Sequence, residues 1–371
     1  MSIIVVDLFC GAGGTSLGAT MAGCRVVLAV DSWTDALAVH KHHHTGTIHM
    51  NKKLGTQKPS EFVADIMNCV RSQMTDPNTH LHVHASPPCQ HISSTNSKRD
   101  VNAGLILVRW TLDLMKALAL SAIQFSFSIE QVAHPHVARL FIDNNVAFKV
   151  ISMGDYGVPQ TRRRLLAVSD IRILDLMAQS YTDWRKLVKI PTGGEFVTGT
   201  SLCQKRLDNH SFSGRKKHIN TALHFYTITR TQAHRFLDEG SKIIANVTVG
   251  DMMTLQTFPS GYFDVPVAGL TVLTKLKLNA NAVPPEFSRV FFTALQNFLL
   301  NHKLPSTDHL PSKLSFSRNG FDELRKFGHF PSKQSATSLL IANVCDTQDR
   351  LHPSSFPCTY GTPHECTRQR C

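Results

Sequence analysis

Residues 3–14, with the sequence IIVVDLFCGAGG, join a run of four branched apolar residues to a turn that contains three glycines. An apolar run of this length, ended by a polar residue, is typical of a strand buried in a parallel sheet. Glycines directly after the strand allow a tight turn and a close approach of a ligand to the backbone. Residues 17–21 then begin a predicted helix.

The same order of strand and helix repeats along the next part of the chain. Apolar or alternating runs predict further strands at residues 26–30, 81–85 and 123–129. Apolar side chains at helical spacing predict a long helix at residues 103–120. Strands that alternate with helices imply an α/β fold with a doubly wound parallel sheet.

Four polar or reactive side chains follow the carboxyl ends of these predicted strands. They are Asp7, Asp31, Cys89 and Glu130. The carboxyl edge of an open α/β sheet is where its ligands bind. We therefore expect the four side chains to converge on one site.

The composition favours a polyanionic partner and an intracellular location. Hydrophobic residues make up 42% of the 371 residues, and 39 basic against 27 acidic residues give a net charge of +12. Such a balance fits a nucleic acid, although a basic surface alone also occurs in proteins that bind none. Nine cysteines without a framework spacing favour a reducing compartment. The apolar runs are short or broken by charges, so we expect a soluble protein with no membrane span.

The glycine turn and Asp31 predict a nucleoside site. Ser16 stands where a dinucleotide-binding turn would have its third glycine, while Asp31 lies twenty positions after Gly11, where a carboxylate accepts hydrogen bonds from ribose hydroxyls. A nucleoside without a pyrophosphate fits this pattern, and S-adenosylmethionine is such a ligand. Asp65 and Ile66 are candidates for an acceptor of the adenine amino group and for an apolar wall beside it.

Cys89 is the candidate nucleophile. It follows a predicted strand within the sequence SPPCQ of residues 86–90, where two prolines fix the backbone of a tight turn. A thiolate held in one position can attack the same atom in every turnover. The alternative is a buried structural cysteine, the interpretation we give to Cys10 and Cys24 because they lie in apolar stretches.

Five motifs in this order resemble those of the DNA cytosine-5 methyltransferase family, over residues 3–292. The similar segments are the cofactor loop at 7–14, Pro-Cys-Gln at 87–90, Gln-x-Arg-x-Arg at 160–164, the segment 255–259 that supports the target domain, and Asn-Ala-Val-Pro-Pro at 281–285. The resemblance implies a Rossmann-like S-adenosylmethionine-dependent methyltransferase fold with a small inserted target-recognition domain.

The resemblance also implies a covalent mechanism on a cytosine in double-stranded DNA. Cys89 adds to C6, which makes C5 nucleophilic toward the methyl group, while Glu130 holds or protonates N3. Arg162 and Arg164 orient the glutamate and touch the base or its phosphate. Because a duplex hides C6, the base must be flipped out of the stack.

The cofactor contacts implied by the motifs and by the residues above are spread along the chain. They are Phe9, Gly11, Gly13, Gly14, Asp31, Asp65, Ile66, Pro87, Asn281 and Val283. We predict no metal site. The histidines at 40, 42–44 and 49 are interpreted as a solvated helix end, and the tail cysteines lack zinc spacing.

The domain organisation expected from these motifs has four parts. Residues 1–170 form the first part of the catalytic domain, 171–245 a target-recognition segment with interleaved basic and aromatic residues, 246–300 the return to the catalytic domain, and 301–371 a partly disordered tail. The polar residues 91–99 are expected to be a mobile closing loop.

Departures from the family pattern leave two alternatives open. Gln131 replaces the asparagine after the catalytic glutamate, Ala280 replaces a glycine, and Gly250 stands where an arginine is usual. These changes predict weaker packing around the site and would suit a DNA-binding protein whose catalysis has decayed. The other alternative is a tRNA cytosine-5 methyltransferase, although the Cys-Phe-Thr element of that branch is missing.

Since the first motif begins beside Met1, we expect a compact enzyme of the restriction-modification or viral kind. We also expect it to act as a monomer.

Overall fold

The computed structural model describes most of residues 1–301. Single residues and short stretches are excluded at 75, 90, 93–99, 122, 161 and 267–268; within 188–247 only 206–210, 216–220, 227–228, 234–237 and 243–246 are described, and residues 302–371 are not. Every structural statement below concerns the described residues.

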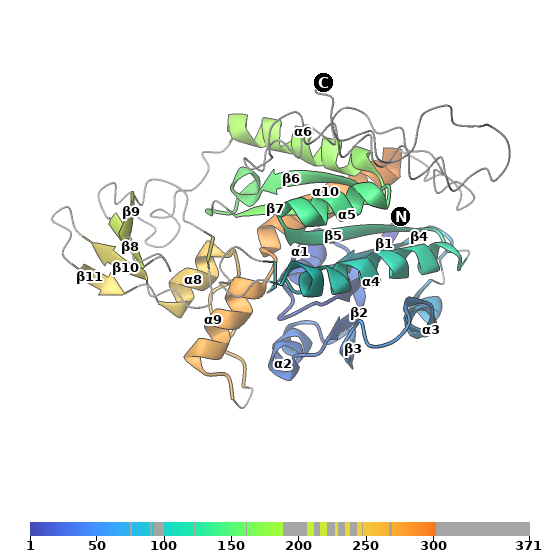
Figure 1. The fold of residues 1–371 in the computed structure, drawn as a ribbon, viewed down its shortest axis with the longest axis horizontal. Coiled ribbons are helices and arrows are strands. Elements are labelled where there is room, and N and C mark those ends of the chain that lie inside the picture. The colour runs from blue at the N-terminus through green and yellow to red at the C-terminus, as the bar shows by residue number, and fades with distance from the viewer. Residues whose placement is uncertain are drawn as a thin grey trace, which may run out of the picture. The chain divides into compact units, whose positions relative to one another are not determined.

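A seven-stranded sheet forms the centre of the fold (Figure 1). Its spatial order is β3-β2-β1-β4-β5-β7-β6. The strands are β1 (Ser2–Leu8), β2 (Arg25–Asp31), β3 (Ile48–Asn51), β4 (Thr79–Ala85), β5 (Phe125–Val132), β6 (Ala147–Ser152) and β7 (Arg163–Val168). The order places β1, β4 and β5 side by side, so the residues that follow them share one edge. The expected α/β fold with strands and helices in alternation is confirmed.

One strand departs from the expected parallel arrangement. β7 is antiparallel to both of its neighbours, β5 and β6. The chain between β6 and β7 holds only residues 153–162, with the short 3₁₀ helix η2 (Met153–Tyr156). A parallel neighbour needs a crossover of about a dozen residues or more. The shorter connection therefore returns the chain in the opposite direction.

Helices cover both faces of the sheet (Figure 1). The side chains of Ile3 and Val5 pack on one face against α1 (Gly14–Met21), α6 (Ile171–Leu187) and α10 (Pro285–Asn301). Ile4 and Val6 pack on the other face against α3 (Pro59–Val70) and α4 (Val101–Ala119). Because neighbouring residues of a strand point to opposite faces, a fully apolar β1 is required to build two cores.

The remaining described elements complete the chain up to residue 301. They are α2 (Thr34–His43), α5 (Pro135–Asp143), the 3₁₀ helix η1 (Arg71–Gln73), α8 (Val249–Leu255) and α9 (Val272–Asn281). A separate four-stranded sheet, in the order β11-β10-β8-β9, contains β8 (Arg206–His210), β9 (Lys216–Asn220), β10 (His234–Leu237) and β11 (Ile243–Asn246). This second sheet lies in the segment expected to read the target.

Two further observations bear on the sequence expectations. Cys10 and Cys24 are buried, at 6% and 5% exposure, which confirms their assignment to the core. No helix in the described part of the chain is long and apolar enough to cross a membrane.

Candidate active site

The glycine turn after β1 is tied to the end of β2. The backbone N–H of Gly11 donates to Asp31 Oδ2 and that of Trp33 donates to Asp31 Oδ1, both at 2.8 Å. Gly13 has a φ of 97°, a conformation that other residues adopt only at a cost. The two bonds hold the Asp31 carboxylate beside the turn, as expected for a ribose-binding acid. Trp33, in the same loop, was not singled out from the sequence.

The closing Asn-Ala-Val-Pro-Pro segment packs onto this turn. A Cβ atom added to Gly14 would lie 2.0 Å from the carbonyl oxygen of Val283. Val283 is buried, whereas Asn281 is exposed. Only glycine at position 14 allows this approach. The contact brings together two predicted cofactor segments that lie far apart in the sequence.

A buried polar network begins at Asp7, behind the glycine turn. Ser16 Oγ donates to Asp7 Oδ2 at 2.7 Å, His40 Nε2 lies 2.9 Å from Ser16 Oγ, and His40 Nδ1 lies 2.8 Å from His49 Nε2. Burial raises the pKa of the Asp7 carboxyl to about 7. Asp7 Oδ1 is buried and has no hydrogen-bond partner among the described residues.

The histidine-rich end of α2 is only in part the solvated helix end expected from the sequence, because His42 and His43 are exposed but His40 and His44 are buried. His40 is fully buried and His44 is 8% exposed. His43 stacks on Tyr262 with ring centroids 3.8 Å apart, and the Tyr262 hydroxyl donates to the Ala12 carbonyl at 2.9 Å. The expectation was wrong for His40 and His44, because both pack against Gly13 of the glycine turn, a contact that local sequence does not reveal.

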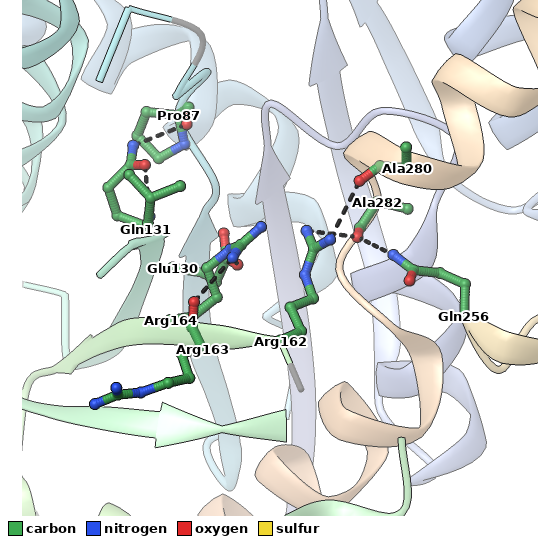
Figure 2. Close-up of polar contacts among 10 residues, drawn as sticks. Pro87, Glu130, Gln131, Arg162, Arg163, Arg164, Gln256, Ala280 and Ala282 are labelled. Carbon is green, nitrogen blue, oxygen red and sulfur yellow. Dashed lines mark hydrogen bonds and ion pairs between the residues drawn. The ribbon is translucent and has the colours of Figure 1, made fainter. Parts of the chain in front are cut away.

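The loop that carries Cys89 is anchored to the two strands that flank it. Gln131 Nε2 donates to the Pro87 carbonyl at 3.0 Å (Figure 2). Ser86 Oγ donates to the Phe9 carbonyl at 3.2 Å. Cys89 itself is partly exposed. Through the first bond, glutamine at position 131 anchors the loop to β5.

Glu130 lies beside Arg164 at the carboxyl end of β5 (Figure 2). Arg164 Nε is 2.9 Å from Glu130 Oε1, and both side chains are largely buried. The pair lacks hydrogen-bond geometry, so Oε1 has an ionic partner but no hydrogen bond among the described residues. The pair places a carboxyl group and a guanidinium at the edge that also carries Cys89.

Arg162 is buried and holds the closing segment rather than the glutamate. Its two terminal nitrogens donate to the carbonyls of Ala280 and Ala282, each at 3.2 Å (Figure 2). These carbonyls belong to the end of α9, where a helix leaves acceptors unpaired. Burial lowers the pKa of Arg162 to about 9, and the charges of Glu130 and Cys89 oppose this shift. Because the contact uses a backbone carbonyl, alanine at position 280 preserves it.

Gln160 joins the catalytic part of the chain to later segments. Its Nε2 donates to the Leu255 carbonyl at 2.7 Å and to Gln256 Oε1 at 2.6 Å, while its Oε1 accepts from the backbone N–H of Ile228 at 3.1 Å. Gln160 and Gln256 are fully buried. The sequence placed both residues in motifs but gave no signal that they bind each other.

Asp65 and Ile66 lie within α3 rather than at a strand end. Lys52 Nζ donates to Asp65 Oδ2 at 2.5 Å, and this bond lowers the pKa of the carboxyl. Ile66 is fully buried in the core between α3 and the sheet. The adenine contacts assigned to these two residues stay predictions.

Several predicted features lie outside the described residues. They are Gln90, Thr161, residues 93–99 of the expected closing loop and most of the interleaved basic and aromatic stretch. The start of that loop is described: Ile92 is fully buried and packs where a side chain at Gly104 would otherwise lie.

Comparison with known proteins shows similarity of the chain to cytosine-specific DNA methylases. Residues 3–105 match the model of the C-5 cytosine-specific DNA methylase family. The type II methyltransferase M.MthTI of Methanothermobacter thermautotrophicus is 32% identical over 179 residues, 45% of this chain and 49% of that protein. The chain thus spans about half the length of this relative.

Two methyltransferases of Herpetosiphon aurantiacus match over larger shares of their length. M.HgiDI is 25% identical over 331 residues, which cover 83% of this chain and 98% of that protein. M.HgiGI is 34% identical over 111 residues, which cover 30% of this chain and 76% of that protein.

A solved structure shares the fold. The Dnmt2 methyltransferase of S. pombe superimposes with a TM-score of 0.57 at 14% identity, covering 81% of this chain and all of that one. At this identity the likeness concerns the fold alone.

Proposed function

Because the chain belongs to the C-5 cytosine-specific DNA methylase family, we propose that it transfers a methyl group from S-adenosylmethionine to C5 of a flipped-out cytosine in double-stranded DNA. The observation that carries the proposal is the convergence at one sheet edge. The loop of Cys89, the Glu130–Arg164 pair and the glycine turn with Asp31 all meet at the carboxyl ends of β1, β2, β4 and β5.

The reaction begins with the addition of the Cys89 thiolate to C6 of the cytosine. The C5–C6 π electrons move into the ring, and Glu130 gives a proton to N3 so that no negative charge accumulates there. C5 then takes the methyl group from S-adenosylmethionine, and the electron pair of the broken C–S bond stays on the sulfur. Water takes up the C5 proton, which restores the C5–C6 double bond and expels Cys89 as a thiolate, and the N3 proton returns to Glu130.

Arg164 and Gln131 support these two reacting groups. Arg164 Nε, 2.9 Å from Glu130, neutralises the carboxylate that remains after proton donation. Gln131 fixes the backbone at Pro87, two residues before the nucleophile. Removal of the bond would release the loop, and loose positioning of a nucleophile costs rate even when the chemistry is intact.

S-adenosylmethionine fits the residues around the glycine turn. Its ribose would be held by Asp31, whose carboxylate oxygens each accept one backbone bond and keep further lone pairs. The turn formed by Gly11, Gly13 and Gly14 gives the backbone access that a nucleoside needs, with Val283 closing it from the other side. The cofactor supplies an electrophilic methyl group.

The inserted segment would read the target. We assign residues 171–245 to target recognition, with residues 1–170 and 246–300 forming the catalytic domain. The four-stranded sheet from β8 to β11 lies within this segment, and Gln160 links Ile228 of the segment to the catalytic part. A net charge of +12 suits the polyanionic substrate.

The test is transfer of labelled methyl groups to duplex DNA and to tRNA, with mapping of the product at base resolution. We expect label at C5 of cytosine in DNA, and none with Cys89→Ser. Label in tRNA alone would move the protein to the tRNA branch. Binding of cofactor and DNA without any transfer would show a decayed enzyme.

A further inference from the structure

β4 and β5 carry an alternation of histidine and serine that the proposed mechanism does not use. β4 reads THLHVHA and β5 reads FSFSIEQV, which place His80, His82 and His84 on one face of β4 and Ser126 and Ser128 on β5. Residues two apart on a strand point to the same face. Five polar side chains are thus directed into the interior between the sheet and its helices.

These side chains form one continuous chain of hydrogen bonds. His80 Nε2 lies 2.8 Å from Ser126 Oγ, which lies 2.8 Å from His82 Nδ1; His82 Nε2 lies 2.9 Å from Ser128 Oγ, which lies 2.8 Å from His84 Nδ1. The chain follows the strands for about 13 Å, given about 3.3 Å per residue. We call it the histidine–serine chain.

The histidine–serine chain is enclosed in apolar surroundings. The ring of His82 packs against both Phe291 and Phe292 of α10, with ring centroids 5.5 and 5.3 Å away. Burial lowers the pKa of His80 to about 4 and that of His84 to about 3. The imidazoles are therefore neutral at physiological pH, and each has one donor and one acceptor nitrogen.

The chain has a consistent direction. Suppose that His80 donates from Nε2 to Ser126. Then Ser126 donates to His82 Nδ1, His82 donates from Nε2 to Ser128, and Ser128 donates to His84 Nδ1. His84 then ends the series with a free Nε2–H donor. The reverse order ends it with an Nε2 acceptor. His84 Nε2 is buried and has no partner among the described residues, and such a group calls for one.

The strand register identifies the partner. His82 binds its register partner Ser126 through Nδ1 and the serine two positions further, Ser128, through Nε2. His84 binds its register partner Ser128 through Nδ1. The position two residues beyond Ser128 is Glu130, whose buried Oε1 is ion-paired with Arg164 but accepts no hydrogen bond from the described residues.

We propose that His84 is a positioning residue for Glu130: when the target base enters, His84 Nε2–H donates to Glu130 Oε1, and the histidine–serine chain holds His84 in the tautomer that makes this bond. The proposal rests on the proposed function, because Glu130 is taken as the acid at N3. A fixed donor on one carboxyl oxygen leaves the other oxygen to face the base. Catalytic hydrogen bonds often tighten only in the substrate complex.

The charged groups at this edge come from three strands and the segment before β7. Asp7 on β1 is the register partner of His84 and offers a second acceptor, Oδ1, without a donor among the described residues. Arg164 on β7 pairs with Glu130, and Arg162 keeps its Nε unpaired in the described part of the structure. Glu130 continues the two-residue period of Ser126 and Ser128. Asp7 and Arg162 are the rival partners of His84, and a result that assigns His84 to either of them would overturn the proposal.

The activity test compares Ser128→Thr with Ser128→Val. The two variants have nearly the same size and shape and differ only in the hydroxyl that joins His82 to His84. We expect kcat of Ser128→Thr to exceed that of Ser128→Val at least tenfold, with equal Kd for DNA and for S-adenosylmethionine. Equal kcat values would overturn the proposal, and an effect confined to the cofactor Kd would assign His84 to Asp7 and overturn it too.

A double-mutant comparison separates positioning from simple stability. The side-chain amide of glutamine always has N–H donors, so its ability to donate does not depend on the hydroxyl at position 128. In the His84→Gln background the kcat ratio between the two Ser128 variants should therefore fall to about 1. An unchanged tenfold ratio in that background would show that the hydroxyl acts without His84, against the proposal.

The tautomer can be measured without activity. In ¹⁵N-labelled wild-type protein at pH 7 we expect His84 to show the Nε2–H tautomer, with its signals identified by their loss in His84→Gln. An Nδ1–H tautomer would overturn the proposal and point to Arg162 as the partner. If the wild-type enzyme transferred no methyl group to cytosine, the proposed function would fail, and this spectrum would still decide the direction of the chain.

Discussion

Acidification from pH 7 to pH 5.5 should destabilise the fold strongly, because buried neutral histidines take up protons only after unfolding. Burial lowers the pKa of His44 and His80 to about 4 and that of His84 to about 3. It also lowers the pKa of His40 and His82 well below the usual range. A histidine with a folded pKa below its unfolded value near 6.5 gives stability that is present above that value and is lost as the pH falls below it.

The magnitude follows from the number of protons. Near pH 5.5 the five histidines bind together about 4.5 protons in the unfolded chain and almost none when folded. Asp7 acts in the opposite direction, because burial raises its pKa to about 7 and the folded state holds its proton first. Integration from pH 7 to pH 5.5 gives a net loss on the order of 5 kcal/mol, comparable with the whole stability of many domains.

Urea titrations at pH 7 and 5.5, followed by tryptophan fluorescence and circular dichroism, measure this loss. We expect the free energy of unfolding to fall on the order of 5 kcal/mol and Tm by about 10 °C. His82→Gln, which removes one of the five histidine protonation sites, should reduce the net pH-dependent loss by about a quarter. A free energy of unfolding that stays constant or rises toward pH 5.5 would refute the assignment of these histidines as buried and neutral.

Three substitutions test contacts around the site. Gly14→Ala should weaken S-adenosylmethionine binding at least tenfold in calorimetry, because its Cβ would lie 2.0 Å from the Val283 carbonyl; unchanged affinity would show that the closing segment does not seal the turn. Gln131→Ala should lower kcat about tenfold with little change in the DNA Kd, since the bond to Pro87 is lost; equal loss in Gln131→Asn and Gln131→Ala would argue against that bond. Arg162→Met, which keeps the length but not the donors, should lower Tm by several degrees, because its hydrogen bonds to the Ala280 and Ala282 carbonyls are lost and only the Ala282 carbonyl keeps a second donor, Gln256 Nε2; an unchanged Tm would contradict this role.

The sequence predicts well what depends on one strand and its turn. Glu130 and Asp31 stand at strand ends, and Cys89 follows the end of β4, because a buried strand ends where its apolar run stops. Parallel neighbours then bring these ends to one edge without further information. Cys10 and Cys24 were assigned to the core for the same local reason.

Features that depend on pairing between distant segments were not predictable. The alternation of histidines in β4 is visible in the sequence, but its partners, Ser126 and Ser128, become neighbours only through the β4–β5 register. The contact of Gly14 with Val283 and the antiparallel course of β7 arise in the same way. His40 was misjudged because a polar residue at a helix end is usually solvated, whereas here Ser16 and His49 satisfy both ring nitrogens inside the fold.

The most direct test of the covalent mechanism is a trapping experiment with duplex DNA that carries 5-fluorocytosine in place of the target cytosine, in the presence of S-adenosylmethionine. Fluorine at C5 cannot leave as a proton does, so the adduct persists through denaturation. We expect a one-to-one protein–DNA complex whose DNA-linked peptide contains Cys89, and no complex with Cys89→Ser. Methyl transfer to cytosine without an adduct, or an adduct at another residue, would contradict the account.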